Sequence, residues 1–307
     1  MNLKMARRTK VVLSLMGGIT FTLLVSQCAK VAFVQQPDLF RTAEEMIEVD
    51  ATTTEDNGYK TQPTREGWNL VWTDEFTNPE IDTTKWEHEV NGNGGGNNEL
   101  QYYTASKANS YIKDGFLVIK AMKQNYKGKF YTSGRLRTAK KADWTYGRFD
   151  IRAKLPIQQG IWPAIWMLPT DWVYGTWPQS GEIDIMEIIG NKPGTLYGTV
   201  HYGDPWPNNK WKSGILELPE GKDFSQEFHE FSVEWEPNEI RWYMDDSLFA
   251  TRVPADLAPH RWPFDQNFHM ILNLAVGGNW PGPPDENTTF PKYMWVDYVR
   301  VYKKSEL

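Results

Sequence analysis

The chain has 307 residues, of which 40% are hydrophobic and 23% are charged, a composition that suits one large globular domain. Its formal net charge of -6 is spread without long runs of like charge, so the basic footprint of a nucleic-acid-binding protein is excluded and neutral ligands fit better than polyanions. One cysteine, Cys28, excludes an internal disulfide, and stability must come from the core.

The first segment, residues 1–28, is predicted to be an export signal. Four basic residues lie in its first ten positions, and an apolar run follows at 11–26, which is short for a membrane span of about 20 residues. Cys28 allows two interpretations: it is the acylated cysteine of a lipoprotein, or it lies at an ordinary cleavage site. We therefore expect an exported protein, either extracellular or an outer-membrane or cell-surface lipoprotein whose membrane contact is the lipid at Cys28.

The next segment, residues 29–66, is acidic, rich in threonine and poor in aromatic residues, with no sustained apolar period. Segments of this composition cannot bury enough apolar surface to fold alone. The sequence therefore predicts a flexible linker over 29–66, followed by one catalytic domain over 67–304.

Short alternating runs fill the chain beyond the linker. Apolar and charged side chains alternate at 146–155 and again at 229–236, which is the period of a β-strand. Helical stripes are nearly missing, and 254–260 amounts to at most one turn. Many short strands separated by Gly, Pro, Asn and Asp predict an all-β sandwich or jelly roll.

The run GEIDIMEIIG carries three carboxylates, Glu182, Asp184 and Glu187, among isoleucines. In a regular strand Glu182 and Asp184 share one face, while Glu187 joins the isoleucines in the core, where an unpartnered carboxylate is costly. One extra residue near Ile185–Met186, a β-bulge, returns Glu187 to the face of the other two acids. The apolar pattern therefore predicts a bulge and an acidic face, and bulges are frequent beside active sites.

Three acids on one face repel each other, so one of them should hold a proton near neutral pH. A solvated polar face and a cation site are alternative interpretations. The favoured one is a carboxylate pair that cleaves a glycosidic bond, which for retention of configuration requires carboxyl groups about 5–5.5 Å apart. Asp184 lies between the two glutamates and can tune their ionisation.

This run, within WPQSGEIDIMEIIG, resembles the signature of glycoside hydrolase family 16, in its bulged branch with the laminarinase-type β-1,3-glucanases. The resemblance covers roughly residues 67–304, and supporting stretches are VWTDEF, GGGNNELQYYT, GIWPAIWMLP and LAVGGNWPG. It implies a concanavalin A-like β-jelly-roll sandwich with a concave cleft. The implied activity is retaining, endo-acting hydrolysis of β-1,3-glucan or mixed-linkage β-glucan through a glycosyl-enzyme.

The resemblance also implies residue roles: Glu182 is the nucleophile, Glu187 the acid and base, and Asp184 the assisting acid. The implied substrate-binding residues are Asn98, Arg135, Trp162, Trp166, Trp177, His201 and Trp280. For Trp162 and Trp166 a place in the core is the alternative, and for His201 a structural role.

No cofactor is expected for catalysis, since the five histidines are scattered without the spacing of metal ligands. A structural Ca²⁺ is implied by the resemblance at Glu75, Gly115 and Asp297, where the ligands would be oxygens. The expected partner is a β-glucan, and the expected state is a monomer. Alternatives are a hydrolase of lichenan, agarose or carrageenan on the same fold, or a non-catalytic lectin.

Overall fold

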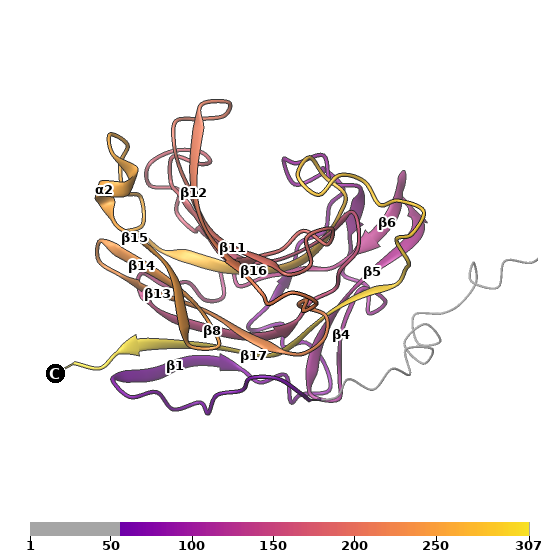
Figure 1. Ribbon diagram of the computed structural model, residues 1–307, viewed down its shortest axis with the longest axis horizontal. Coiled ribbons are helices and arrows are strands. Elements are labelled where there is room, and N and C mark those ends of the chain that lie inside the picture. Colours follow the sequence, from indigo (N-terminus) through magenta and orange to yellow (C-terminus); the bar gives the residue numbers. More distant parts are fainter. Residues whose placement is uncertain (1–55, 307) are drawn as a thin grey trace, which may run out of the picture. The chain divides into compact units, whose positions relative to one another are not determined.

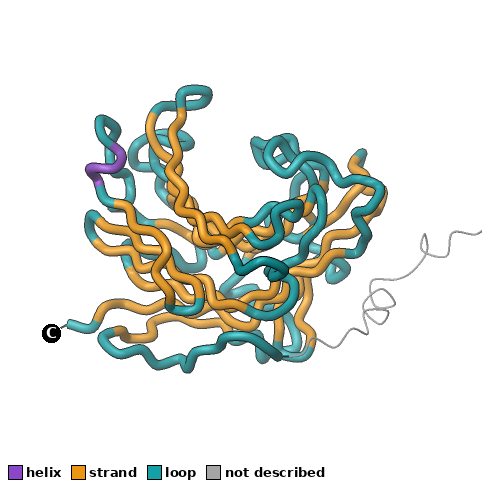
Figure 2. Tube along the Cα trace, in the orientation of Figure 1, coloured by secondary structure: helices purple, strands orange, loops and turns teal. Residues whose placement is uncertain are grey.

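The computed structural model describes residues 56–306, which fold into two β-sheets laid face to face (Figures 1 and 2). The sheet that carries the three acids is called the inner sheet, and the other is the outer sheet. In order of pairing, the inner sheet contains β12 (Asn209–Glu217), β11 (Thr195–Gly203), β10 (Glu182–Glu187), β9 (Ile161–Pro169), β16 (Phe268–Val276), β7 (Arg135–Arg137) and β2 (Glu87–His88).

The outer sheet is larger and has the C-terminal strand near its centre. In order of pairing it contains β15 (Ser247–Arg252), β14 (Glu239–Met244), β13 (His229–Glu236), β8 (Gly147–Lys154), β17 (Lys292–Lys304), β5 (Phe116–Tyr126), β6 (Lys129–Ser133) and β3 (Gln101–Tyr103). In addition, β1 (Trp68–Asp74) pairs with β17 and β4 (Ser110–Lys113) pairs with β5. The predicted all-β sandwich is confirmed.

Helix is limited, among the described residues, to α2 (Pro254–Leu257), as the sequence predicts. No helix in residues 56–306 is long and apolar enough to cross a membrane. The predicted export signal, with Cys28, lies outside the described residues and stays a prediction.

The main core lies between the sheets, where period-two strands from both contribute one face each. The inner sheet contributes residues such as Ile165, Ile183 and Leu272, which are fully buried. The outer sheet contributes the apolar faces of β8 and β13. The alternation predicted at 146–155 and 229–236 is confirmed in these two strands.

The opposite faces of β8 and β13 are also buried, which the sequence did not indicate. Arg148, Asp150 and Arg152 of β8 and Glu230 of β13 are at most 4% exposed. They are covered by residues 57–66, which we call the N-terminal strap. The prediction of a flexible linker through residue 66 is therefore wrong for its last part, because the strap belongs to the folded domain.

Ion pairs hold the N-terminal strap on the outer sheet. Arg65 forms ion pairs with Asp150 at 2.5 Å, with Asp246 at 2.8 Å and with Glu230. The guanidinium of Arg152 donates to the backbone carbonyls of Tyr59 and Asn57. Polar strap residues are thus paired with polar strand residues, which is why a segment of low hydrophobicity packs there.

Candidate active site

The β10 strand is bulged, as the isoleucine pattern predicts. Against β9, Asp184 pairs with Trp166 and Met186 pairs with Ile165, so Ile185 has no partner of its own. Against β11, the register also shifts between Asp184 and Glu187. The consequence is that Ile185 is buried in the core while Glu187 lines the same hollow as Glu182 and Asp184.

A tryptophan of the outer sheet supports the backbone at this bulge. The indole N–H of Trp242, on β14, donates to the backbone carbonyl of Asp184 at 2.8 Å. The indole passes beneath Gly198 of β11, where an added Cβ would lie 2.4 Å from its Cδ1 atom. The absence of a side chain at Gly198 therefore lets Trp242 reach the Asp184 carbonyl at the start of the bulge.

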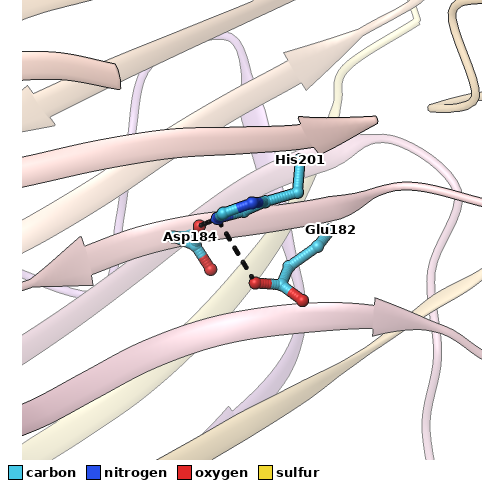
Figure 3. Close-up of side chains that lie close together, drawn as sticks. All are labelled: Glu182, Asp184 and His201. Carbon is cyan, nitrogen blue, oxygen red and sulfur yellow. Dashed lines mark ion pairs between the residues drawn. The ribbon is translucent and has the colours of Figure 1, made fainter. Parts of the chain in front are cut away.

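Glu182, Asp184 and His201 converge at the centre of the inner sheet (Figure 3). The His201 Nε2 atom lies 3.2 Å from Asp184 Oδ2 and 3.6 Å from Glu182 Oε1. Ligand atoms of these three residues lie within 4.8 Å of one another. The cluster places two carboxyl groups and one imidazole around a single small volume.

Burial raises the pKa of Asp184 well above its ordinary value, and the charge and hydrogen bond of Glu182 raise it further. Burial also raises the pKa of Glu187 well above its ordinary value, with a further rise from Asp184. His201 and the hydrogen bond from Trp162 act on Glu187 in the opposite direction. Glu187 therefore holds a proton at higher pH than a solvated glutamate does, which is the property required of a general acid.

Each glutamate accepts a hydrogen bond from a different indole. Trp177 Nε1 donates to Glu182 Oε2 at 2.7 Å, and Trp162 Nε1 donates to Glu187 Oε1 at 3.0 Å. Trp162 is 9% exposed and lines the hollow. These two indoles fix the orientation of the carboxyl groups at both ends of the bulge.

Arg135 and Trp166 line the hollow beside the acids. The Arg135 guanidinium lies 4.8 Å from the ring centre of Trp166, and Trp166 donates to Asn273 Oδ1 at 2.7 Å. Trp280, predicted at the rim, is 40% exposed and packs edge-on against Trp162 with ring centres 5.5 Å apart.

Asn98 is the predicted residue that the structure does not bring to the acids. Its side chain is exposed and donates to Asn279 Oδ1 at 2.9 Å, whereas its neighbour Asn97 lines the hollow. The loop has no alternating pattern of side chains that would distinguish Asn97 from Asn98 in the sequence.

Two further residues of the hollow were not singled out by the sequence. Asn273 comes from β16, a strand whose residues are all buried, and Glu99 follows the glycine-rich loop. A polar residue within an otherwise apolar strand was the available signal for Asn273. Burial raises the pKa of Glu99, although hydrogen bonds from Gln101 and Tyr103 and the charge of Arg135 counteract this rise.

Two of the three predicted calcium ligands, the carboxyl groups of Glu75 and Asp297, have protein partners already. Glu75 accepts two hydrogen bonds from Arg300, each of 2.8 Å, and Asp297 forms ion pairs with Arg152 at 2.8 Å and with Lys60 at 3.0 Å. Burial raises the pKa of Glu75, but Arg300 and a hydroxyl donor outweigh it and hold that pKa below its usual value. Cationic side chains take the place of a metal here, so Glu75 and Asp297 do not fit a calcium ion in this arrangement.

A second hollow, of about 450 Å³, lies between the N-terminal strap and the outer sheet. Four of the charged groups that line it form ion pairs with one another, Arg65 with Asp246 and Arg148 with Glu234. Perturbed carboxyl groups beside indole rings occur in the hollow of the inner sheet, which is therefore the candidate active site.

Two glutamates that line one hollow, one of them with a raised pKa, are the kind of carboxyl pair that most glycoside hydrolases use. Comparison with known proteins agrees: the model of the family described as glycosyl hydrolases family 16 matches residues 69–299. The chain belongs to this family.

The chain is 46% identical over 251 residues to a beta-glucanase of Rhodothermus marinus, covering 77% of this chain and 85% of that protein. It is 44% identical over 272 residues to glucan endo-1,3-beta-glucosidase A1 of Niallia circulans, covering 80% of this chain but only 39% of that longer protein. The laminarinase catalytic domain of Thermotoga maritima superposes with a TM-score of 0.72 at 44% identity, covering 78% of this chain and all of that domain.

Proposed function

We propose that this protein is an endo-acting β-1,3-glucanase that hydrolyses laminarin-like glucans with retention of configuration. The observation that carries the proposal is the pair of glutamates on the bulged strand, one of which, Glu187, has its pKa raised by burial. The names of the relatives, which include endo-1,3-beta-glucosidases and a laminarinase, support the substrate class.

In the first step, a carboxylate oxygen of Glu182 attacks the anomeric carbon, while the proton of Glu187 passes to the departing glycosidic oxygen. The carbon–oxygen bond to the departing sugar breaks, and an ester bond to Glu182 forms. Trp177 holds Glu182 through its 2.7 Å hydrogen bond. Asp184, protonated because of its raised pKa, donates to Glu182 and limits the repulsion between the two groups.

In the second step, Glu187 has become a carboxylate and takes a proton from water. The water oxygen attacks the anomeric carbon, the ester bond breaks, and Glu182 returns as a carboxylate. Trp162 donates to Glu187 and so stabilises its charged form between the two steps. Both steps balance with carboxyl groups and water alone, so the proposal includes no cofactor.

Release of reducing ends from laminarin, lichenan, agarose and carrageenan tests the proposal. The purified protein should act on laminarin, and Glu182→Gln should remove the activity without altering the fold measured by circular dichroism. Release from agarose alone would refute the glucanase assignment, and binding without release from any polymer would favour the lectin.

We further propose that the protein is exported and acts as a monomer, with residues 1–28 as the signal. The basic start and the apolar run at 11–26 support export. The mass of the mature N-terminus distinguishes an acylated Cys28 from ordinary cleavage.

A further inference from the structure

The hairpin of β11 and β12 carries a tryptophan in line with the acids. In antiparallel pairs, residues directly opposite each other present their side chains on the same face. Glu182 pairs with His201, and His201 pairs with Trp211. Because the His201 imidazole contacts Glu182 and Asp184, the paired position of Trp211 places its indole on the face of the acids.

The neighbours of Trp211 on β12 support this orientation. On the same face, Ser213 Oγ lies 2.9 Å from Thr199 Oγ1, and Thr199 pairs with Asp184. On the opposite face, Gly214 is packed so closely to the outer sheet that an added Cβ would lie 2.1 Å from that of Ala250. The odd-numbered residues of β12 therefore face the acids, and the even-numbered ones face the outer sheet.

Trp211 is exposed and stands at the edge of the sheet. Its side chain is 62% exposed, and β12 is the terminal strand of the inner sheet. Figure 1 shows the β11–β12 hairpin rising beyond the other inner strands. Two strand spacings, roughly 10 Å, separate the backbones at Trp211 and Glu182. A sugar unit on Trp211 would therefore lie near the unit being cleaved without being that unit.

An exposed indole on an edge strand offers a flat apolar surface that a ligand or another chain can cover. Two occupants are conceivable, a second copy of the chain and a polysaccharide. The row from Glu182 through His201 to Trp211 is continuous with the candidate active site, and aromatic rings with a few polar neighbours are typical of small-ligand sites. These observations favour a sugar as the occupant.

We propose that Trp211 is a stacking platform for a distal glucosyl unit of the β-glucan chain, and thus a determinant of the chain length that the enzyme prefers. This inference rests on the proposed function. The flat, apolar face of a pyranose lies on the indole, and Ser213 lies beside it on the same face of the strand.

Titration calorimetry with β-1,3-linked gluco-oligosaccharides of increasing length tests the platform, using the Glu182→Gln protein so that ligands stay intact. Adding Trp211→Ala should weaken binding of the longer oligosaccharides roughly tenfold and leave the shortest unaffected. Trp211→Phe should restore most of the affinity. Lys212→Ala, on the other face of the same strand, is the matched control and should change nothing.

Three results would contradict the role proposed for Trp211. Trp211→Ala could leave the binding of every oligosaccharide unchanged, or weaken the binding of short and long oligosaccharides equally. Alternatively, sedimentation could show a dimer that this substitution dissociates. Laminarin hydrolysis by the unmodified protein is measured alongside. If the unmodified protein releases no reducing ends, the proposed function fails. If it hydrolyses laminarin, and adding Trp211→Ala to the Glu182→Gln protein leaves binding unchanged, only the role proposed for Trp211 fails.

Discussion

The ionisation of Glu187 depends on a few contacts that can be changed one at a time. Burial and the neighbouring Asp184 raise its pKa, while His201 and the hydrogen bond from Trp162 lower it. The indole of Trp162 therefore lowers the pKa of the carboxyl group to which the proposed mechanism gives the role of proton donor. Glu182 has an indole of its own, Trp177, so the two glutamates can be perturbed separately.

Trp162→Phe should move the basic limb of the pH–rate profile to higher pH. In the proposed mechanism, activity requires protonated Glu187 and is lost as pH rises through its pKa. The indole N–H favours the charged form, so its removal raises that pKa further. The maximal kcat should also fall about tenfold, since a hydrogen bond to a charged group contributes roughly 1.5 kcal/mol. The measurement is kcat on laminarin against pH.

Trp177→Phe is the control for that profile. It removes an indole donor from Glu182 and leaves Glu187 untouched, so kcat should fall while the basic limb stays in place. A basic limb that stays fixed or moves to lower pH in Trp162→Phe would contradict the role given to Trp162.

At the scale of elements, the bulge in β10 depends on the outer sheet. The Trp242 indole crosses the core beneath Gly198 and satisfies the Asp184 carbonyl. The two sheets are therefore joined by a hydrogen bond directly under the acids, in addition to apolar packing. The isoleucine pattern predicted the bulge, but this donor lies 58 residues away in sequence and no local pattern indicates it.

Trp242→Phe should destabilise the domain by about 2 kcal/mol, because it removes a buried hydrogen bond to the Asp184 carbonyl and also apolar volume. At a temperature where the protein is fully folded, Trp242→Phe should also lower kcat more than a core substitution elsewhere does. Phe268→Leu, in the fully buried part of β16, is a suitable comparison. Denaturant unfolding and kcat on laminarin measure the two effects. Equal kcat in both variants would show that Trp242 does not maintain the geometry of the bulge.

At the scale of the whole domain, the N-terminal strap neutralises a buried acidic cluster. Asp150 and Glu230 are fully buried, and Arg65 bonds both. Burial and the charge of Asp150 raise the pKa of Glu230, and hydrogen bonds from Thr61 and Tyr298 together with the charge of Arg65 partly offset this rise. Without the strap, two carboxyl groups on neighbouring strands would lack a principal partner.

Arg65→Ala should lower the midpoint of thermal unfolding by about 10 °C, because breaking a buried ion pair costs about 3 kcal/mol or more. Lys107→Ala breaks the exposed pair with Glu80 and should lower it by no more than about 2 °C. Scanning calorimetry makes the comparison. Equal midpoints for the two variants would show that the strap does not stabilise the domain.

The sequence predicted those parts of the molecule that a local apolar period specifies. The strands β8 and β13 and the bulge at Ile185 follow from alternation, and the indoles of Trp162 and Trp177 contact the acids in the region that the motifs indicated. What the sequence did not show depends on partners distant along the chain. The strap was predicted as linker because Arg65 finds its partners 85 to 181 positions later.

The position of β17 has a consequence for the order of events during folding. This strand is the last of the strands in residues 56–306, yet it lies between β8 and β5 and also pairs with β1. While the chain is being synthesised, the outer sheet cannot close until residues 292–304 have been added. Such long-range pairing is slow to form, so closure of the outer sheet is expected to be a late event that waits for residues 292–304.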